Sequence, residues 1–197
     1  MISELIGTVC QAILDRIVRG LSYLKIDPNL ITFVGFLITL PSAWFLAKGN
    51  FFAAGWVIII SGLFDMLDGR VARITNSVTR FGAFFDSVLD RYSDMAIFIG
   101  LMMYYSRSHR MGYAVLAGIA MMGSVQTSYA RARAECLIPL CKVGFLERPE
   151  RLVLLIIGTL FNRMAPVLWV LAVFSNLTVI HRIYFTWQKT RKSENLV

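Results

Sequence analysis

The chain has 197 residues, 57% of them hydrophobic, a mean hydropathy of +0.64 and a formal net charge of +8. A water-soluble domain of this length does not need so much apolar sequence, so the composition excludes an ordinary soluble protein and predicts an integral membrane protein. The positive charge does not indicate nucleic-acid binding, because no such motif is present and basic residues of membrane proteins usually face anionic lipid.

The first 27 residues are amphipathic and carry Arg16, Arg19 and Lys25. They lack the small-residue cleavage site of a secretory signal. We therefore expect residues 1–27 to form an interfacial helix that lies along the membrane surface.

Six apolar segments follow, and they predict transmembrane helices near residues 30–48, 51–73, 82–105, 111–134, 150–163 and 165–187. Several are short or polar at one end, which favours a tight bundle with a wet cavity over six isolated lipid-facing rods. Gly118, Ala120 and Gly123 permit close helix approach and a dimer face. The prediction is one all-α membrane domain over 1–197, with a six-helix bundle at 28–190 and a tail at 191–197.

Lys and Arg predict the orientation of this bundle. The loops at Lys48, at Arg107 and Arg110, and at Arg163 share one side, and they hold only four of the twenty basic residues. The positive-inside rule places the other sixteen, both termini and the acidic segment described next in the cytoplasm. We therefore expect a multi-pass protein of the inner (cytoplasmic) membrane whose site faces the cytoplasm.

Four carboxylates lie within 26 residues of this apolar chain: Asp65, Asp68, Asp86 and Asp90. Asp65 and Asp68 share one helix face, and Asp86 and Asp90 share a face of the next helix. Carboxylates inside a membrane are costly and usually mark a functional site. The economical reason to gather four is a hard divalent cation, Mg²⁺ or Mn²⁺, bound through oxygen.

In this interpretation Asp65, Asp68 and Asp86 are the first metal ligands, and Asp90 either joins them or acts as general base on an alcohol. Gly69 and Ala72 leave room for a substrate, and Arg73 is placed to bind a phosphate. The alternatives are a cation pathway, as in a divalent-cation transporter, or simple pairing with arginines 70, 73, 80 and 91. Asp94 continues the face of Asp90 and is expected as an ion-pair partner.

The pattern D-x2-D-G-x2-A-R-x8-G-x3-D-x3-D, from Asp65 to Asp90, resembles the signature of the CDP-alcohol phosphotransferase family at every fixed position. The segment from Pro28 to Thr32 also resembles the family. The resemblance implies a homodimer of six-helix protomers, a CDP-diacylglycerol donor and displacement of CMP by an alcohol. It assigns the donor to Asn29, Thr32, Asp68, Gly69, Ala72, Arg73 and Thr79, with Asp65, Asp68 and Asp86 on the metal and Asp90 as base.

A second basic region lies at 128–151, with a further basic residue at 182. Such a set can hold an anionic second substrate, although topology, lipid contact and local pairs such as Glu147 with Arg151 would also explain single residues. The strings SYxRARAE and ERxER resemble the branch of the family whose acceptor is inositol 1-phosphate. That resemblance implies acceptor-phosphate contacts from Ser128, Arg131, Arg133, Arg148, Arg151 and Arg182. Glycerol 3-phosphate is the alternative acceptor.

Overall fold

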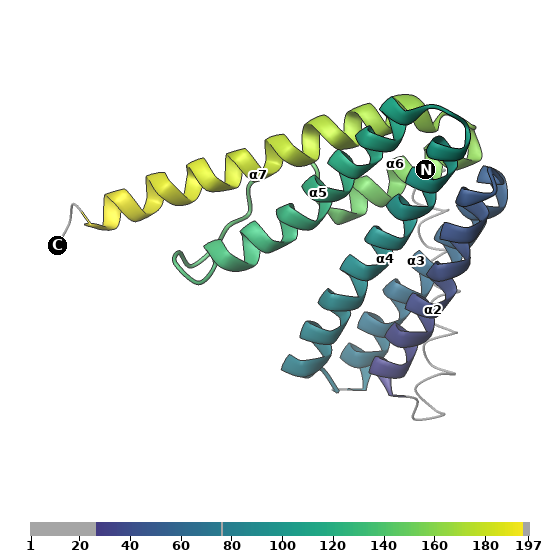
Figure 1. Ribbon diagram of the computed structural model, residues 1–197. Helices are drawn as coiled ribbons and strands as arrows, with labels where there is room; N and C mark the ends of the chain where they lie inside the picture. The colour runs from purple at the N-terminus through teal and green to yellow at the C-terminus, as the bar shows by residue number, and fades with distance from the viewer. Residues whose placement is uncertain (1–26, 76, 195–197) are drawn as a thin grey trace, which may run out of the picture.

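The computed structural model describes residues 27–75 and 77–194, so the predicted interfacial helix lies, except for Asp27, outside the described residues. The described part is all-helical (Figure 1). Its helices are α2 Pro28–Ala47, α3 Phe51–Ile74, α4 Arg80–Arg107, α5 Met111–Ala134, α6 Arg148–Leu160 and α7 Met164–Glu194. Each predicted span falls on one of them. The prediction for the last span ended too early, because residues 188–194 contain neither Gly nor Pro and continue the helix.

Polar side chains fix where the helices around the acidic segment begin. The Asp27 carboxylate accepts from the Asn29 N–H before α2, the Asn50 side chain from the Ala53 N–H before α3, and the Thr79 hydroxyl from the Gly82 N–H before α4. These contacts satisfy backbone donors that have no partner within the helix. The turn between α2 and α3 contains Gly49 at φ +79°, a conformation that glycine adopts without steric cost.

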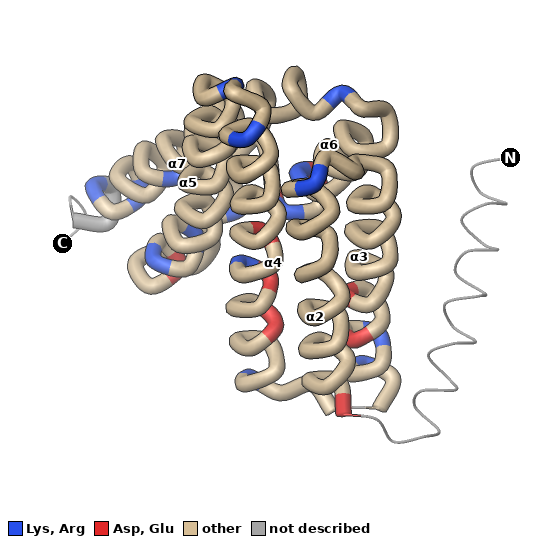
Figure 2. The backbone as a smooth tube through the Cα atoms, turned by 45° about the vertical axis from the view of Figure 1, so that its right-hand side comes forward, with Lys and Arg blue, Asp and Glu red and all other residues tan. Residues whose placement is uncertain are grey.

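Two groups of helices make up the molecule (Figure 1). Helix α2 packs along both α3 and α4, while α5 packs along α7, and α4 joins the groups through α5. The short helix α6 contacts α3 and α7. Close approach of α2 and α4 depends on Gly100, where a Cβ would lie 2.4 Å from the Ala43 carbonyl oxygen. Acidic residues of α3 and α4 meet arginines of α6 near the junction of the two groups (Figure 2).

The small residues of α5 serve packing inside the protomer. Ala120 is fully buried, and a Cβ on Gly123 would lie 2.7 Å from the Asn176 side chain of α7. The expected close approach is therefore confirmed, but its partner is α7 of the same chain. These residues give no support to a dimer face at this position.

Three of the described helices are long and apolar enough to cross a membrane, over Pro28–Ala47, Phe51–Ile74 and Met164–Arg191. Trp44, Phe52 and Trp56 each expose more than half of their surface, as expected for side chains that face lipid. Helix α6 has only 13 residues, fewer than the roughly 20 that span a bilayer. It packs between longer helices, and this packing places the Arg148 and Arg151 side chains inside the protein rather than in lipid.

Candidate active site

Three carboxylates converge where the last turns of α3 meet the first turns of α4. Asp65 and Asp68 come from α3 and Asp86 from α4, and one oxygen of each lies within 4.8 Å of the others. Asp68 is buried, and its Oδ2 accepts a hydrogen bond of 2.5 Å from the Thr32 hydroxyl of α2. The helical spacing seen in the sequence therefore brings the carboxylates into one cluster, with α2 supporting it from the side.

The cluster fits a divalent cation. Three carboxylates this close repel one another unless a positive charge lies between them, and oxygen ligands suit Mg²⁺ and Mn²⁺. The Asp86 Oδ1 atom is buried and has no hydrogen-bond partner among the described residues, so it is available as a ligand. Asp90 does not join the three-carboxylate cluster and lies one turn farther along α4.

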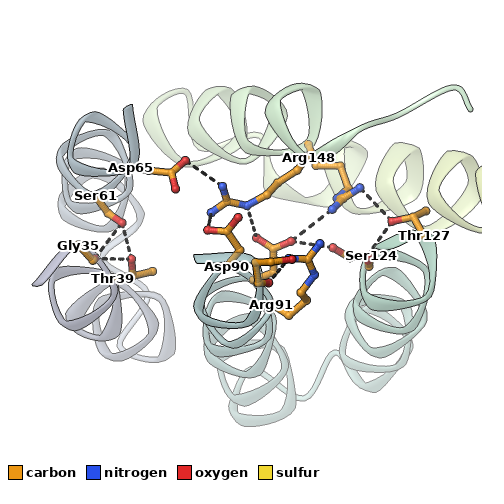
Figure 3. A network of polar contacts seen from close by, with 12 residues as sticks. Gly35, Thr39, Ser61, Asp65, Asp90, Arg91, Ser124, Thr127 and Arg148 are labelled. Carbon is orange, nitrogen blue, oxygen red and sulfur yellow. Dashed lines mark hydrogen bonds and ion pairs between the residues drawn. The ribbon is translucent and has the colours of Figure 1, made fainter. Parts of the chain in front are cut away.

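An arginine of α6 joins the two acidic helices (Figure 3). Arg148 Nη1 lies 2.9 Å from Asp65 Oδ2, and its Nη2 lies 2.7 Å from Asp90 Oδ1. Its side chain is only 23% exposed, so these charge-assisted bonds are formed in a partly desolvated place. The sequence predicted Arg148 as a phosphate ligand. The fold sets its guanidinium between the carboxylate cluster and the candidate base, at the edge of a second pocket described below.

One cavity opens beside the acidic cluster. Its volume is about 280 Å³. All seven residues predicted to contact the CDP-lipid donor line it, although they come from α2, α3 and the start of α4. The lining residues are Asp27, Pro28, Asn29, Thr32, Asp68, Gly69, Ala72, Arg73, Ser77, Val78, Thr79, Gly82, Ala83 and Asp86. The exposed Arg73 side chain is folded back at rest, because its Nε donates to the Gly69 carbonyl oxygen at 2.9 Å.

Two glycines of this cavity have different physical roles. A Cβ on Gly82 would lie 3.0 Å from both the Asn29 side-chain oxygen and the Thr79 hydroxyl, so packing within the protein favours a glycine there. A Cβ on Gly69 would meet nothing closer than Arg73 Nη2, at 3.8 Å. The protein itself has space for a methyl group at Gly69, and the absence of one leaves that space to a ligand.

A second pocket, of about 380 Å³, lies on the other side of α4. Five arginines and two glutamates line it, so it carries an excess of positive charge. The lining residues are Ser87, Arg91, Thr127, Ser128, Arg131, Ala132, Glu135, Glu147, Arg148, Pro149, Arg151 and Arg182. Five of the six residues predicted to hold the acceptor phosphate are among them. We call this the basic pocket.

Arg133 is the predicted residue that the fold does not bring into the basic pocket. It follows Arg131 by two residues, which turns it about 200° around α5. Its side chain is exposed and lines a separate groove beside Tyr129 and Trp187. The alternation RAR therefore places its two arginines on different faces of one helix.

Local pairing also differs from expectation. Glu147 Oε1 lies 3.5 Å from Arg182 Nη2 and 3.7 Å from Arg131 Nη1. The expected partner, Arg151, pairs with Asp94 of α4 instead.

Sequence reasoning missed Ser87 and Arg91 as pocket residues, although their position next to Asp86 and Asp90 on α4 was a usable signal. The Arg91 guanidinium donates to the hydroxyl and carbonyl oxygens of Ser87.

The fold and the site together define a membrane-type helical protein with a carboxylate cluster suited to a divalent metal and a pocket on either side of α4. A sequence profile described as CDP-alcohol phosphatidyltransferase matches residues 25–187. The chain belongs to this family, and it is therefore a transferase of phospholipid synthesis that uses a divalent metal.

Individual relatives are similar over nearly the whole chain. An archaetidylinositol phosphate synthase of Pyrococcus horikoshii is 35% identical over 93% of this chain and 95% of its own length. A phosphatidylinositol phosphate synthase of Mycobacterium tuberculosis is 37% identical, covering 87% of this chain and 84% of its own.

Solved structures of a Mycobacterium tuberculosis phosphatidylinositol phosphate synthase are also similar. The form with CDP-DAG bound aligns with a TM-score of 0.83 and 33% identity over 89% of this chain and 94% of that one. The form in complex with manganese and citrate aligns with a TM-score of 0.79 and 32% identity, over 88% of each chain.

Proposed function

We propose that this protein transfers the phosphatidyl group of CDP-diacylglycerol to inositol 1-phosphate, giving phosphatidylinositol phosphate and CMP. The observation that carries the proposal is the position of the acidic cluster between two pockets of different character. The cavity next to the acidic cluster, which we call the signature cavity, lies on one side of α4, and the basic pocket lies on the other. The ion pair between Arg148 and Asp90 lies between these two pockets.

The donor belongs in the signature cavity. Asp65, Asp68 and Asp86 would hold Mg²⁺ or Mn²⁺, which supplies positive charge at the donor diphosphate. The space at Gly69 lets the diphosphate approach the helix backbone. Asn29, Thr32, Ala72 and Thr79 line the same cavity around the nucleotide, and Arg73 binds a phosphate when its guanidinium turns from the Gly69 carbonyl.

The acceptor belongs in the basic pocket, with its phosphate on Arg151 and Arg182 and on Ser128 and Arg131 at the rim. The acceptor hydroxyl oxygen forms a bond to the phosphorus that carries diacylglycerol. The bond from that phosphorus to the oxygen of CMP breaks, and CMP leaves. The hydroxyl proton passes to Asp90, whose Oδ1 is held by Arg148, so Oδ2 takes the proton.

The lining favours a phosphorylated polyol. Its arginines supply positive charge for a phosphate, while the Ser87, Glu135 and Glu147 side chains add polar groups that can meet several hydroxyls. Glycerol 3-phosphate has two hydroxyls and would leave much of this polar lining without a partner. The names of the similar synthases support the same acceptor.

The test is CMP release by protein purified in detergent, with CDP-diacylglycerol and one acceptor at a time, with and without Mg²⁺. We expect metal-dependent release with inositol 1-phosphate and much less with glycerol 3-phosphate, free inositol or serine. Release only with glycerol 3-phosphate would keep the mechanism and overturn the acceptor. Metal flux into liposomes without CMP release would favour a cation transporter instead.

We also propose six membrane spans in one domain, a homodimer, and both termini in the cytoplasm, with the protein in the inner membrane of its cell. The short α6 can be one of these spans because its polar first turn lies inside the protein, where other helices take the place of lipid. Support comes from the sequence positions of the basic residues: the loops after α2, α4 and α6, together with the last residue of α4, hold four of the twenty, and the other sixteen lie in segments predicted on the side of the acidic cluster. Cys136 is exposed in the loop between α5 and α6 and is a natural reporter. In a variant with Cys10 and Cys141 replaced by serine, an impermeant maleimide should label Cys136 only from the cytoplasmic side. Cross-linking in membranes tests the dimer.

A further inference from the structure

A buried carboxylate outside the family signature lies one turn beyond Asp90. Asp94 is only 7% exposed, and its polar partners come from two other helices, α5 and α6. Its Oδ2 accepts a hydrogen bond of 3.0 Å from the Ser124 hydroxyl and lies 3.4 Å from Arg151 Nη2. Its Oδ1 lies 3.9 Å from Arg148 Nε. None of the steps given above uses this group.

We propose that Asp94 is a positioning residue that holds the Arg151 guanidinium, next to that of Arg148, in the orientation that receives the acceptor phosphate. This inference rests on the proposed function, because it takes the basic pocket as the acceptor site. Asp94 itself does not touch the substrate: it lies behind the two arginines and is not part of the pocket lining.

The contacts of Arg151 make this role specific. Its side chain is 4% exposed, its Nη1 donates to the Thr127 hydroxyl at 3.2 Å and the Leu146 carbonyl at 3.4 Å, and its Nη2 pairs with Asp94. One end of the guanidinium is therefore fixed by the protein. The Nε donor is buried and has no partner among the described residues. Since Arg151 lines the basic pocket, its positive charge lies next to any anionic ligand bound there.

Charge explains why a carboxylate is needed at this place. Arg148 and Arg151 are both largely buried, and two buried cations repel each other and are costly without a compensating anion. Asp94 has one oxygen toward each. An amide in its place would keep the shape and the Ser124 contact but would leave Arg151 without a carboxylate partner beside the charge of Arg148, so the Arg151 guanidinium would shift.

The test compares Asp94→Asn with wild type in the CMP-release assay and in calorimetric titrations with inositol 1-phosphate. We expect the acceptor KM and the acceptor Kd to rise at least tenfold, the CDP-diacylglycerol KM to change less than twofold, and kcat at saturating acceptor to stay within threefold. A merely structural defect would weaken the binding of both substrates and lower kcat together, and it would also lower the melting temperature. The matched control is Ser124→Ala, which removes the other partner of Asp94 and leaves the ion pair; it should keep the wild-type acceptor KM.

A double-mutant cycle with Arg151→Gln identifies the route. If Asp94 acts through Arg151, the Asp94→Asn change should add at most threefold to the acceptor Kd of the Arg151→Gln variant. Full additivity, unchanged acceptor binding in Asp94→Asn, or tighter binding from the loss of a negative charge would each overturn the proposal.

Failure of the proposed function would look different. If wild-type protein binds inositol 1-phosphate but releases CMP only with another acceptor, the proposed reaction is wrong and the Kd comparison still tests Asp94. If wild-type protein binds neither inositol 1-phosphate nor inorganic phosphate, the basic pocket is not an anion site and the role of Asp94 falls with it.

Discussion

Two glycine substitutions separate what the fold requires from what the ligand requires. Gly69→Ala places a methyl group in the signature cavity, where its nearest protein neighbour would be Arg73 Nη2 at 3.8 Å. Gly100→Ala places a methyl group 2.4 Å from the Ala43 carbonyl oxygen and 2.8 Å from the Ala43 Cα, and backbone atoms of a packed helix cannot yield as a side chain can.

The two substitutions are expected to change the free energy of unfolding in opposite directions. Gly100→Ala forces α2 and α4 apart, and overpacking of this kind costs about 1–3 kcal/mol of the free energy of unfolding. Gly69→Ala meets no clash and exchanges a poor helix former for a good one, which is worth up to about 1 kcal/mol in stability. Its cost falls on the donor diphosphate, and a loss of about 1.4–2.8 kcal/mol of binding corresponds to a 10–100-fold rise in the donor KM.

The assay measures both properties of both variants in the same detergent. Thermal unfolding followed by size-exclusion chromatography gives the melting temperature, and CMP release at varied CDP-diacylglycerol gives the donor KM. Gly69→Ala should keep the wild-type melting temperature or exceed it while losing donor affinity, and Gly100→Ala should melt several degrees lower. A wild-type donor KM in Gly69→Ala would refute the assignment of that space to the donor. A large fall in its melting temperature would refute the local geometry.

Three further predictions concern the acidic cluster and its supports. Asp90→Asn should lower kcat by about 10²–10⁴-fold, as expected for loss of a general base, while the melting temperature and the metal affinity stay near wild type; an active variant would remove Asp90 from that role. Chelation with EDTA should abolish CMP release, and Asp86→Asn should require more Mg²⁺ for half-maximal activity, whereas an unchanged Mg²⁺ dependence would exclude Asp86 as a ligand. Thr79→Ala should cost about 1 kcal/mol in stability through loss of the α4 cap, and an unchanged melting temperature would contradict that capping contact.

The local features of this protein follow from its sequence. Helical spacing alone groups Asp65 with Asp68 and Asp86 with Asp90, and six of the residues that line the signature cavity, between Asp68 and Asp86, fall on matched positions of a fixed pattern. The helix bounds were predictable because turns and caps, such as the one at Gly49 and Asn50, interrupt apolar runs. Both depend on residues that are close together along the chain.

The tertiary structure decided the partners of the arginines. The sequence paired Glu147 with Arg151 because they are four residues apart, but the fold brings the buried Asp94 of α4 within reach of Arg151, and α7 brings Arg182 to Glu147. The sequence likewise grouped Arg133 with Arg131, which the turn of α5 separates. Spacing along one helix states which side chains share a face. Only the packing of several helices decides which side chains lie next to a buried charge. A buried charge is costly without a partner, so it pairs with the opposite charge that the fold brings near it.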